Sequence, residues 1–160
     1  MGVRVLAVIA AVLLLLGAAC GGDGDGATDS SAIVIRTKMI IAAQENTEPI
    51  ATGDILQGST LEGAPFCAGG TILDSHADRD PAMEPYLIDR TISCPDGTVR
   101  VGVTPDVGAE TEGRTQKGSW TIVDGTGAFD GLRGSGTMEV VYGSDEDAPV
   151  RETLTGTVTR

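Results

Sequence analysis

Residues 118–137, GSWTIVDGTGAFDGLRGSGT, indicate the fold more clearly than any other stretch of this 160-residue chain. Apolar and polar side chains alternate through Trp120 and Ile122, and again through Met138 and Val140 beyond the glycines. A period of two is typical of β-strands whose two faces differ. Glycine permits sharp bends and close approach between strands, so the glycines at 125, 127, 131, 134 and 136 predict a sheet that curls here. The stretch therefore predicts two strands joined by a glycine-rich turn.

The rest of the chain continues this pattern, because short β-branched segments alternate with turn residues. Strands are predicted at residues 33–42, 50–60, 69–74, 86–94, 99–103, 114–124, 138–142 and 150–159. The Asp96-Gly97 pair predicts a tight turn between two of them. Since the chain ends on a strand, pairing of that strand with an early one would close the sheet and remove its edges. The sequence thus predicts an all-β fold, a small antiparallel closed barrel of about eight strands.

Residues 122–134, IVDGTGAFDGLRG, resemble the Gly-Thr-Gly-x-Phe-x-Gly-x-x-Gly segment of the allene oxide cyclase and dirigent barrel superfamily. They look still closer to the bacterial allene-oxide-cyclase-like barrels of actinobacterial secreted proteins. The resemblance implies an antiparallel barrel in which this segment forms a structural corner. Some members of the family form trimers. A cyclase or isomerase activity is implied by this analogy alone, because the family's catalytic residues are not placed on this sequence.

Residues 1–19 predict a lipoprotein signal peptide. Arg4 precedes an apolar run that is too short to span a bilayer of about 30 Å, which is typical of a secretory signal. The run ends in Ala18-Ala19-Cys20, which resembles a bacterial lipobox with Cys20 as the diacylated, palmitate-bearing residue. The alternative is an ordinary signal peptide that leaves Cys20 as a free thiol. Residues 20–32 predict a flexible tether, and residues 33–160 predict one barrel domain on the outer side of a bacterial cell membrane.

Cys67 and Cys94 are the two cysteines that remain once Cys20 is assigned to the anchor. In an exported protein such a pair predicts a disulfide. A redox or metal role is the alternative, and the chain has neither a Cys-x-x-Cys motif nor a second histidine to support it.

A formal net charge of −12 argues against nucleic acid as a partner, because such binding needs clustered lysine and arginine. The expected contacts are the membrane, through Cys20, and a small-molecule ligand. The sequence leaves the oligomeric state open.

Arg90 is the residue most suggestive of a site. Within the predicted strand 86–94 it falls on the side of Ile88, Ile92 and Cys94, which should face inward. A buried arginine needs a hydrogen-bonded partner. It would either pair with an internal carboxylate or bind an anionic ligand in the lumen, unless a bulge turns it out to solvent. The carboxylates considered are Asp74, Glu139 and Glu152.

Further candidates are weaker. Ligand contact is considered for Arg90, Trp120, Glu139 and Tyr142, although the two aromatic residues also suit a core. Asp74, His76, Asp78 and Asp80 would share one face of an extended segment, and oxygen ligands suit calcium. Their spacing matches no calcium loop, so a solvated loop is the alternative. No cofactor is predicted, since the sequence has no nucleophile motif and no phosphate-binding loop, and a lone Gly-x-Gly precedes no helix.

These observations predict a lipid-anchored, non-enzymatic barrel outside the cytoplasm. It would bind a small apolar or anionic ligand, or a protein partner. An isomerase or cyclase and a structural envelope protein are the alternatives. Barrels of this size hold either packed side chains or one small ligand, so the content of the lumen separates these functions.

Overall fold

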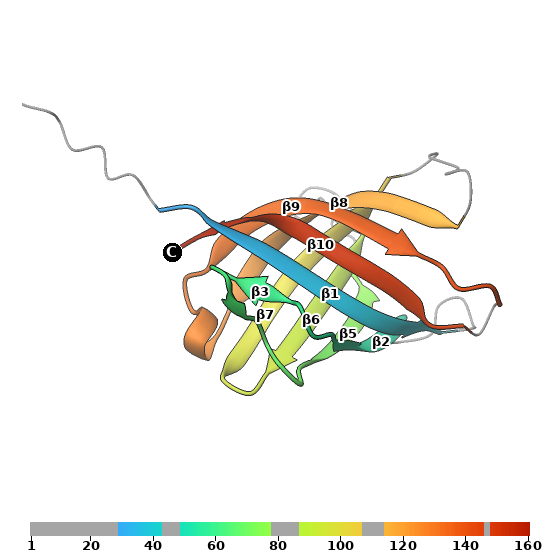
Figure 1. The fold of residues 1–160 in the computed structure, drawn as a ribbon, viewed down its shortest axis with the longest axis horizontal. Coiled ribbons are helices and arrows are strands. Elements are labelled where there is room, and N and C mark those ends of the chain that lie inside the picture. Colours follow the sequence, from blue (N-terminus) through green and yellow to red (C-terminus); the bar gives the residue numbers. More distant parts are fainter. Residues whose placement is uncertain (1–28, 43–48, 78–86, 107–113, 146–147) are drawn as a thin grey trace, which may run out of the picture.

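The computed structural model describes residues 29–42, 49–77, 87–106, 114–145 and 148–160. The strands of the barrel are β1 (Ser31–Ile41), β2 (Ala51–Ile55), β5 (Thr71–His76), β6 (Ile88–Cys94), β7 (Gly97–Pro105), β8 (Thr115–Gly125), β9 (Arg133–Val141) and β10 (Val150–Thr159). They form a closed antiparallel barrel in the order β10-β9-β8-β7-β6-β5-β2-β1, and β1 returns to pair with β10 (Figure 1). The predicted fold class is therefore confirmed. Within the described ranges, no helix has the length and apolar character needed to cross a bilayer.

The expected strand over residues 50–60 is wrong in its second half. β2 ends at Ile55, and the chain then forms a small hairpin of β3 (Thr60–Leu61) and β4 (Ala64–Pro65). Because β2 has 5 residues and β1 has 11, β2 pairs only with the later half of β1, and β3 pairs with its earlier half. Gly58 and Gly63 have positive φ values of 86° and 79°, which allows the two turns of this excursion.

Smaller differences concern strand ends. β1 begins at Ser31, two residues before the predicted start. The tight turn between β6 and β7 has Pro95 and Asp96 as its two loop residues, because Cys94 pairs directly with Gly97. The turn is thus placed one residue earlier than the Asp-Gly preference suggests.

Strand glycines let the barrel hold its one tryptophan. Trp120 on β8 lies directly opposite Gly136 on β9, which lies opposite Gly156 on β10. A Cβ atom on Gly156 would stand 2.6 Å from Cζ2 of the indole, so glycine is needed there. The indole Nε1 donates a hydrogen bond to the carbonyl oxygen of Thr137 at 3.1 Å. The glycines of residues 118–137 and of β10 therefore serve packing in addition to curvature.

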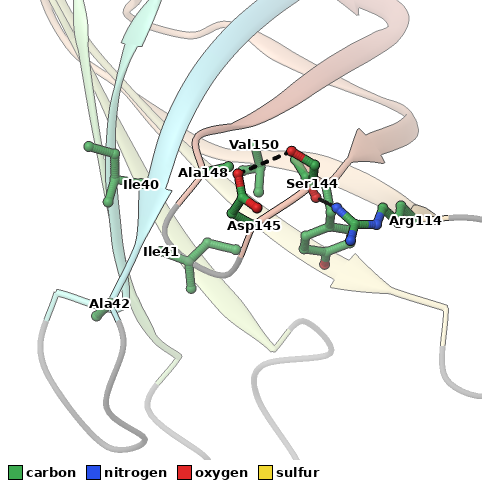
Figure 2. A pocket seen from close by; sticks show the side chains of 10 residues that line it. Ile40, Ile41, Ala42, Arg114, Ser144, Asp145, Ala148 and Val150 are labelled. Atoms are coloured by element: carbon green, nitrogen blue, oxygen red, sulfur yellow. Dashed lines mark hydrogen bonds between the residues drawn. The ribbon is translucent and has the colours of Figure 1, made fainter.

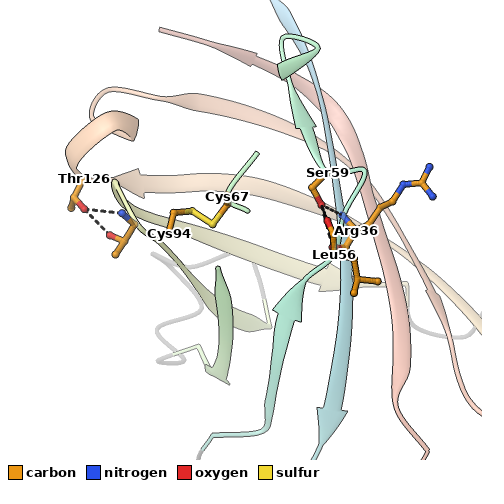
Figure 3. The surroundings of a disulfide bond; sticks show 7 residues. Arg36, Leu56, Ser59, Cys67, Cys94 and Thr126 are labelled. Atoms are coloured by element: carbon orange, nitrogen blue, oxygen red, sulfur yellow. Dashed lines mark hydrogen bonds between the residues drawn. A yellow bond between two sulfur atoms is a disulfide. The ribbon is translucent and has the colours of Figure 1, made fainter. Parts of the chain in front are cut away.

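One end of the barrel, called the base here, is filled by aromatic side chains. The short helix η1 (Gly127–Phe129) follows β8 and buries Phe129 edge-on against Phe66, with ring centroids 5.6 Å apart. The predicted disulfide is present: Cys67 and Cys94 are bonded, with Cα atoms 5.0 Å apart (Figure 3). It ties the segment after β4 to the end of β6, so the base is held covalently as well as by packing.

The other end, called the mouth here, is where β1, β5, β7 and β9 finish and where β2, β6, β8 and β10 begin. The residues that line a pocket at this end come from most of the barrel strands. Any ligand site in the lumen therefore has to be approached from the mouth.

Candidate functional site

Arg90 points into the barrel, as its alternation with Ile92 predicts, and is 1% exposed. It lies directly opposite Asp74 on the neighbouring strand β5. Its Nε donates to Oδ1 of Asp74 and its Nη2 donates to Oδ2, both at 2.7 Å. Two parallel hydrogen bonds between a guanidinium and a carboxylate form a strong and directional pair. The expected internal pairing of Arg90 is thus confirmed for Asp74.

A second carboxylate reaches Arg90 from across the barrel. Nη1 of Arg90 donates to Oε2 of Glu152, which lies on β10. β6 and β10 are separated by three strands in either direction around the barrel, so this ion pair crosses the interior. Thr37 lies opposite Glu152 on β1, and its hydroxyl donates to the same Oε2 at 3.4 Å. Asp74, Arg90 and Glu152 together are called the interior ion cluster below.

The interior ion cluster holds one cation and two carboxyl groups, all nearly without solvent contact. Burial raises the pKa of Glu152 above its ordinary value; Arg90 opposes this rise through its charge and hydrogen bond, while the charge of Asp74 adds to it. Burial by itself would lower the pKa of Arg90, but the charges and hydrogen bonds of Glu152 and Asp74 raise it above its ordinary value. Arg90 therefore stays cationic, and burial favours the protonated form of Glu152.

A pocket of about 110 Å³ extends from the mouth to this cluster and is called the mouth pocket. Its polar lining consists of the interior ion cluster and Gln116 from β8. The remaining lining is apolar or aromatic: Met39, Ile41, Ile50, Ala51, Ile88, Pro105, Met138, Val140, Tyr142 and Val150. A mainly apolar cavity with a few converging polar groups is the usual composition of a small-molecule site.

A second, more open pocket of about 400 Å³ adjoins the mouth pocket and is called the rim pocket (Figure 2). The two share Ile41, Tyr142 and Val150. Figure 2 shows Arg114 reaching toward the segment after β9, where its Nη1 donates to the carbonyl oxygen of Gly143. A ligand in the mouth pocket could therefore extend outward along the end of β1 without leaving the protein surface.

Tyr142 stands where the two pockets meet, and its hydroxyl donates a 2.5 Å hydrogen bond to Oε1 of Gln116. Partial burial raises the pKa of Tyr142, and the nearby charge of Glu152 adds to the rise. The phenol therefore stays neutral over the ordinary pH range and remains a hydrogen-bond donor.

Of the four residues predicted to contact a ligand, two line the mouth pocket and two do not. Arg90 and Tyr142 line the mouth pocket. Trp120 lies in the hydrophobic core and lines neither pocket. Glu139 is exposed on the outer face of β9, opposite Lys117 on β8, and does not point into the lumen. Only the first two candidates are therefore brought together, and ligand contact by any of them stays a prediction.

The proposed metal ligands do not converge among the described residues. Both oxygens of Asp74 accept hydrogen bonds from Arg90. His76 ends β5 and is exposed, while Asp78 and Asp80 lie outside the described residues. Within the described ranges, no three histidine, cysteine or acidic side chains are grouped closely enough to hold a metal ion.

Several residues that contact the interior ion cluster or line the mouth pocket were not among the candidates predicted from the sequence. Thr37 is a polar residue in the inward row of β1, between the buried Ile35 and Met39, and that position was a usable signal. Met39 and Met138 line the pocket without any sequence feature that separates them from core methionines. Apolar pocket residues and apolar core residues follow the same alternation, so the sequence cannot distinguish them.

Comparisons of this chain with protein-family models, with curated proteins and with solved structures found no match. Its function has to be inferred from the mouth pocket and the interior ion cluster.

Proposed function

We propose that the protein is a lipid-anchored binding barrel, held outside the cytoplasm, that takes up a small and mainly apolar molecule through its mouth. The observation that carries this proposal is the mouth pocket, which is apolar around its sides and ends on a buried, hydrogen-bonded ion cluster. The apolar sides would supply affinity through burial, and the polar inner end would orient the ligand.

The dimensions suit a small ligand or one end of a longer one. An apolar cavity of about 150 Å³ holds benzene, and the mouth pocket is somewhat smaller at about 110 Å³. The rim pocket continues it outward. An anionic ligand is disfavoured, because Arg90 is already paired with two carboxylates that would repel it.

The methionines provide a direct test. In protein labelled with ¹³C at methionine methyl groups, Met39 and Met138 should shift when cyclopentanone or methylenecyclopentane is added, because both residues line the pocket. Ala51→Leu, which adds side-chain volume to the pocket wall, should weaken the shifts at least tenfold. Thr52→Leu is the matched control, since Thr52 lies next in β2 but faces solvent.

Native mass spectrometry of protein purified from its own host should also reveal a bound small molecule. Absence of methyl shifts with either probe, together with absence of a bound molecule, would overturn the binding function and favour a structural role in the envelope.

The anchor and the family belong to the same proposal. The lipobox-like end of residues 1–19 supports acylation of Cys20, and the barrel supports kinship with allene-oxide-cyclase-like proteins. Intact mass of the mature protein should show the chain from Cys20 with added acyl groups. Cys20→Ser should be released from membranes, and a Cys20→Ser protein that stays membrane-bound would contradict the anchor.

An isomerase or cyclase is the second candidate function, favoured by one specific observation. A buried carboxyl with a raised pKa, facing an apolar pocket, is the arrangement of a general acid. Turnover of an unsaturated fatty-acid epoxide to a cyclised product, lost in Glu152→Gln, would support it. Rates equal to those of the uncatalysed background reaction would leave the binding function as the remaining candidate.

A further inference from the structure

Glu152 uses only one of its two carboxyl oxygens within the interior ion cluster. The hydrogen bonds from Arg90 and from Thr37 both end on Oε2. Among the described residues, no hydrogen bond reaches Oε1. Asp74 differs, since each of its oxygens accepts a hydrogen bond from Arg90. Oε1 of Glu152 is thus the one carboxyl oxygen of the cluster left for a ligand, and its side chain lines the mouth pocket.

Charge balance determines the state of that oxygen. With both carboxyl groups ionised, the cluster would carry one uncompensated negative charge on side chains that are almost wholly buried. Burial of an unpaired charge costs several kcal/mol, so a buried group of this kind tends to become neutral. A proton on Oε1 of Glu152 neutralises the cluster without breaking any of its hydrogen bonds. The group that faces the pocket is then a hydrogen-bond donor.

Among the residues that the structure describes around Glu152, none supplies a second cation that would keep it ionised. Arg90 from β6 and Asp74 from β5 face it, and the neutral Tyr142 lies beyond the end of β9. β1 contributes Thr37, β8 contributes Gln116, and the other lining residues are apolar. His76, at the exposed end of β5, is the remaining titratable residue on the inward side of that strand.

We propose that the mouth pocket selects a small uncharged molecule that carries a hydrogen-bond acceptor, such as a ketone or ether oxygen, and that this oxygen accepts a hydrogen bond from Oε1 of Glu152. The inference rests on the proposed binding function and names the class of its ligand. A carboxylate ligand would meet two acidic groups, and an ammonium ligand would need the uncompensated anionic form of the cluster. An alkene of the same shape would leave the buried donor without a partner, which a binding site rejects.

Binding should consequently depend on pH. Once the pH exceeds the raised pKa of Glu152, Oε1 loses its proton and changes from donor to acceptor. The fraction of protein competent to bind then falls tenfold for each further pH unit, and the apparent affinity falls with it. The same trend should be absent for a ligand that makes no hydrogen bond.

The test uses four probes that share a five-membered ring, followed through the methyl signals of Met39 and Met138. Cyclopentanone carries the acceptor, methylenecyclopentane is its isostere without one, and cyclopentylammonium and cyclopentanecarboxylate carry charges. Cyclopentanone should bind at least tenfold more tightly than the other three, and its affinity should fall about tenfold per pH unit above the pKa of Glu152. The ¹³C carboxyl signal of Glu152 gives that pKa independently.

Glu152→Gln is the decisive variant. Its amide oxygen can accept from Arg90 and Thr37, while its amide nitrogen presents N–H donors to the pocket at every pH. Cyclopentanone binding should therefore persist in Glu152→Gln and lose its pH dependence, whereas Glu152→Leu should reduce it at least tenfold. Glu139→Gln on the outer face is the matched control and should keep the pH profile of the unmodified protein.

Two outcomes overturn the inference while leaving the binding function intact. These are equal affinity for cyclopentanone and methylenecyclopentane, and tighter binding of cyclopentylammonium with rising pH. Absence of methyl shifts with any probe would instead overturn the binding function itself.

Discussion

Arg90 and Glu152 form an ion pair that crosses the interior of the barrel, between strands separated by three others on either side. Most contacts in a barrel link neighbouring strands. This pair instead connects opposite walls of the barrel, which the hydrogen bonds of the sheet do not join directly. It also marks the inner limit of the mouth pocket, with the filled base on its other side. The pair thus separates the packed part of the lumen from the part open to a ligand.

Arg90→Met should destabilise the protein by about 3–5 kcal/mol, because two buried carboxyl groups would lose their shared cation. The measurement is the free energy of unfolding from urea titrations. Arg100→Met is the comparison, since its ion pair with Asp89 is partly exposed and should contribute only about 0.2–1 kcal/mol.

Replacement of the whole interior ion cluster tests whether unpaired buried charge causes the instability of Arg90→Met. Arg90→Met combined with Asp74→Leu and Glu152→Leu removes every buried charge and should recover most of the loss, because apolar replacements of buried ion networks are often neutral or stabilising. A triple variant as unstable as Arg90→Met alone would show that packing, and not charge, accounts for the loss.

The stability of the folded state should depend on the protonation of Glu152. Its pKa is raised in the folded state, so folded protein holds more protons than unfolded protein between the unfolded value of about 4.3 and the folded one. The free energy of unfolding contributed by Glu152 is therefore fully present below that window and falls as the pH rises through it. Glu152→Gln lacks this contribution.

Urea unfolding of the two proteins at a series of pH values gives the difference directly. The stability of the unmodified protein relative to Glu152→Gln should decrease as the pH rises from acid to neutral. A difference that stays constant would mean that folding leaves the pKa of Glu152 unchanged, and a difference that grows with pH would mean that folding lowers it.

Loss of the disulfide should weaken the base. Cys67→Ser with Cys94→Ser opens a loop between residues 27 positions apart and should cost about 3–4 kcal/mol by chain entropy. The methyl signals of Met39 and Met138 should stay close to their original positions, because the pocket lies at the other end of the barrel. Thermal unfolding with and without reductant measures the effect, and equal transitions would contradict it.

Gly156→Ala should destabilise the barrel although alanine ordinarily suits a strand better than glycine does. The added Cβ would lie 2.6 Å from Cζ2 of Trp120 and 2.2 Å from the carbonyl oxygen of Ser135. Overpacking of this kind costs about 1–3 kcal/mol, and the near-ultraviolet circular dichroism of Trp120 should change with it.

Thr155→Ala, one residue earlier and facing solvent, is the control and should change the stability by less than about 0.5 kcal/mol. A Gly156→Ala protein as stable as this control would mean that the indole has room to move.

Much of the architecture follows from local patterns. Alternation in 114–124 and 150–159 identifies the strands and their inward faces, and the same rule places Arg90 inside. The two cysteines that remain once Cys20 is assigned to the predicted anchor lead to the disulfide, which is present. The hairpin of β3 and β4 could not be predicted, because it follows from the unequal lengths of β1 and β2, which is a property of the assembled sheet.

The site was only half predictable. Asp74, Glu139 and Glu152 were all named as possible partners of Arg90, and only Glu139 lies on the outer face. Its position between the inward Met138 and Val140 was the signal that would have excluded it. The size of the mouth pocket depends on the combined volumes of side chains from all strands of the barrel. A local sequence pattern does not contain that information.

The pairing of β1 with β10 has a consequence for biogenesis. Ser31 pairs with Val158 and Met39 pairs with Val150. The first strand of the domain therefore cannot form this pairing until the last strand has been synthesised. Until then the chain exposes two unpaired sheet edges, which are templates for aggregation, and contacts so distant in sequence slow folding. A premature stop before β10 would remove Glu152 together with the partner of β1, leaving neither a closed ring nor a complete mouth pocket.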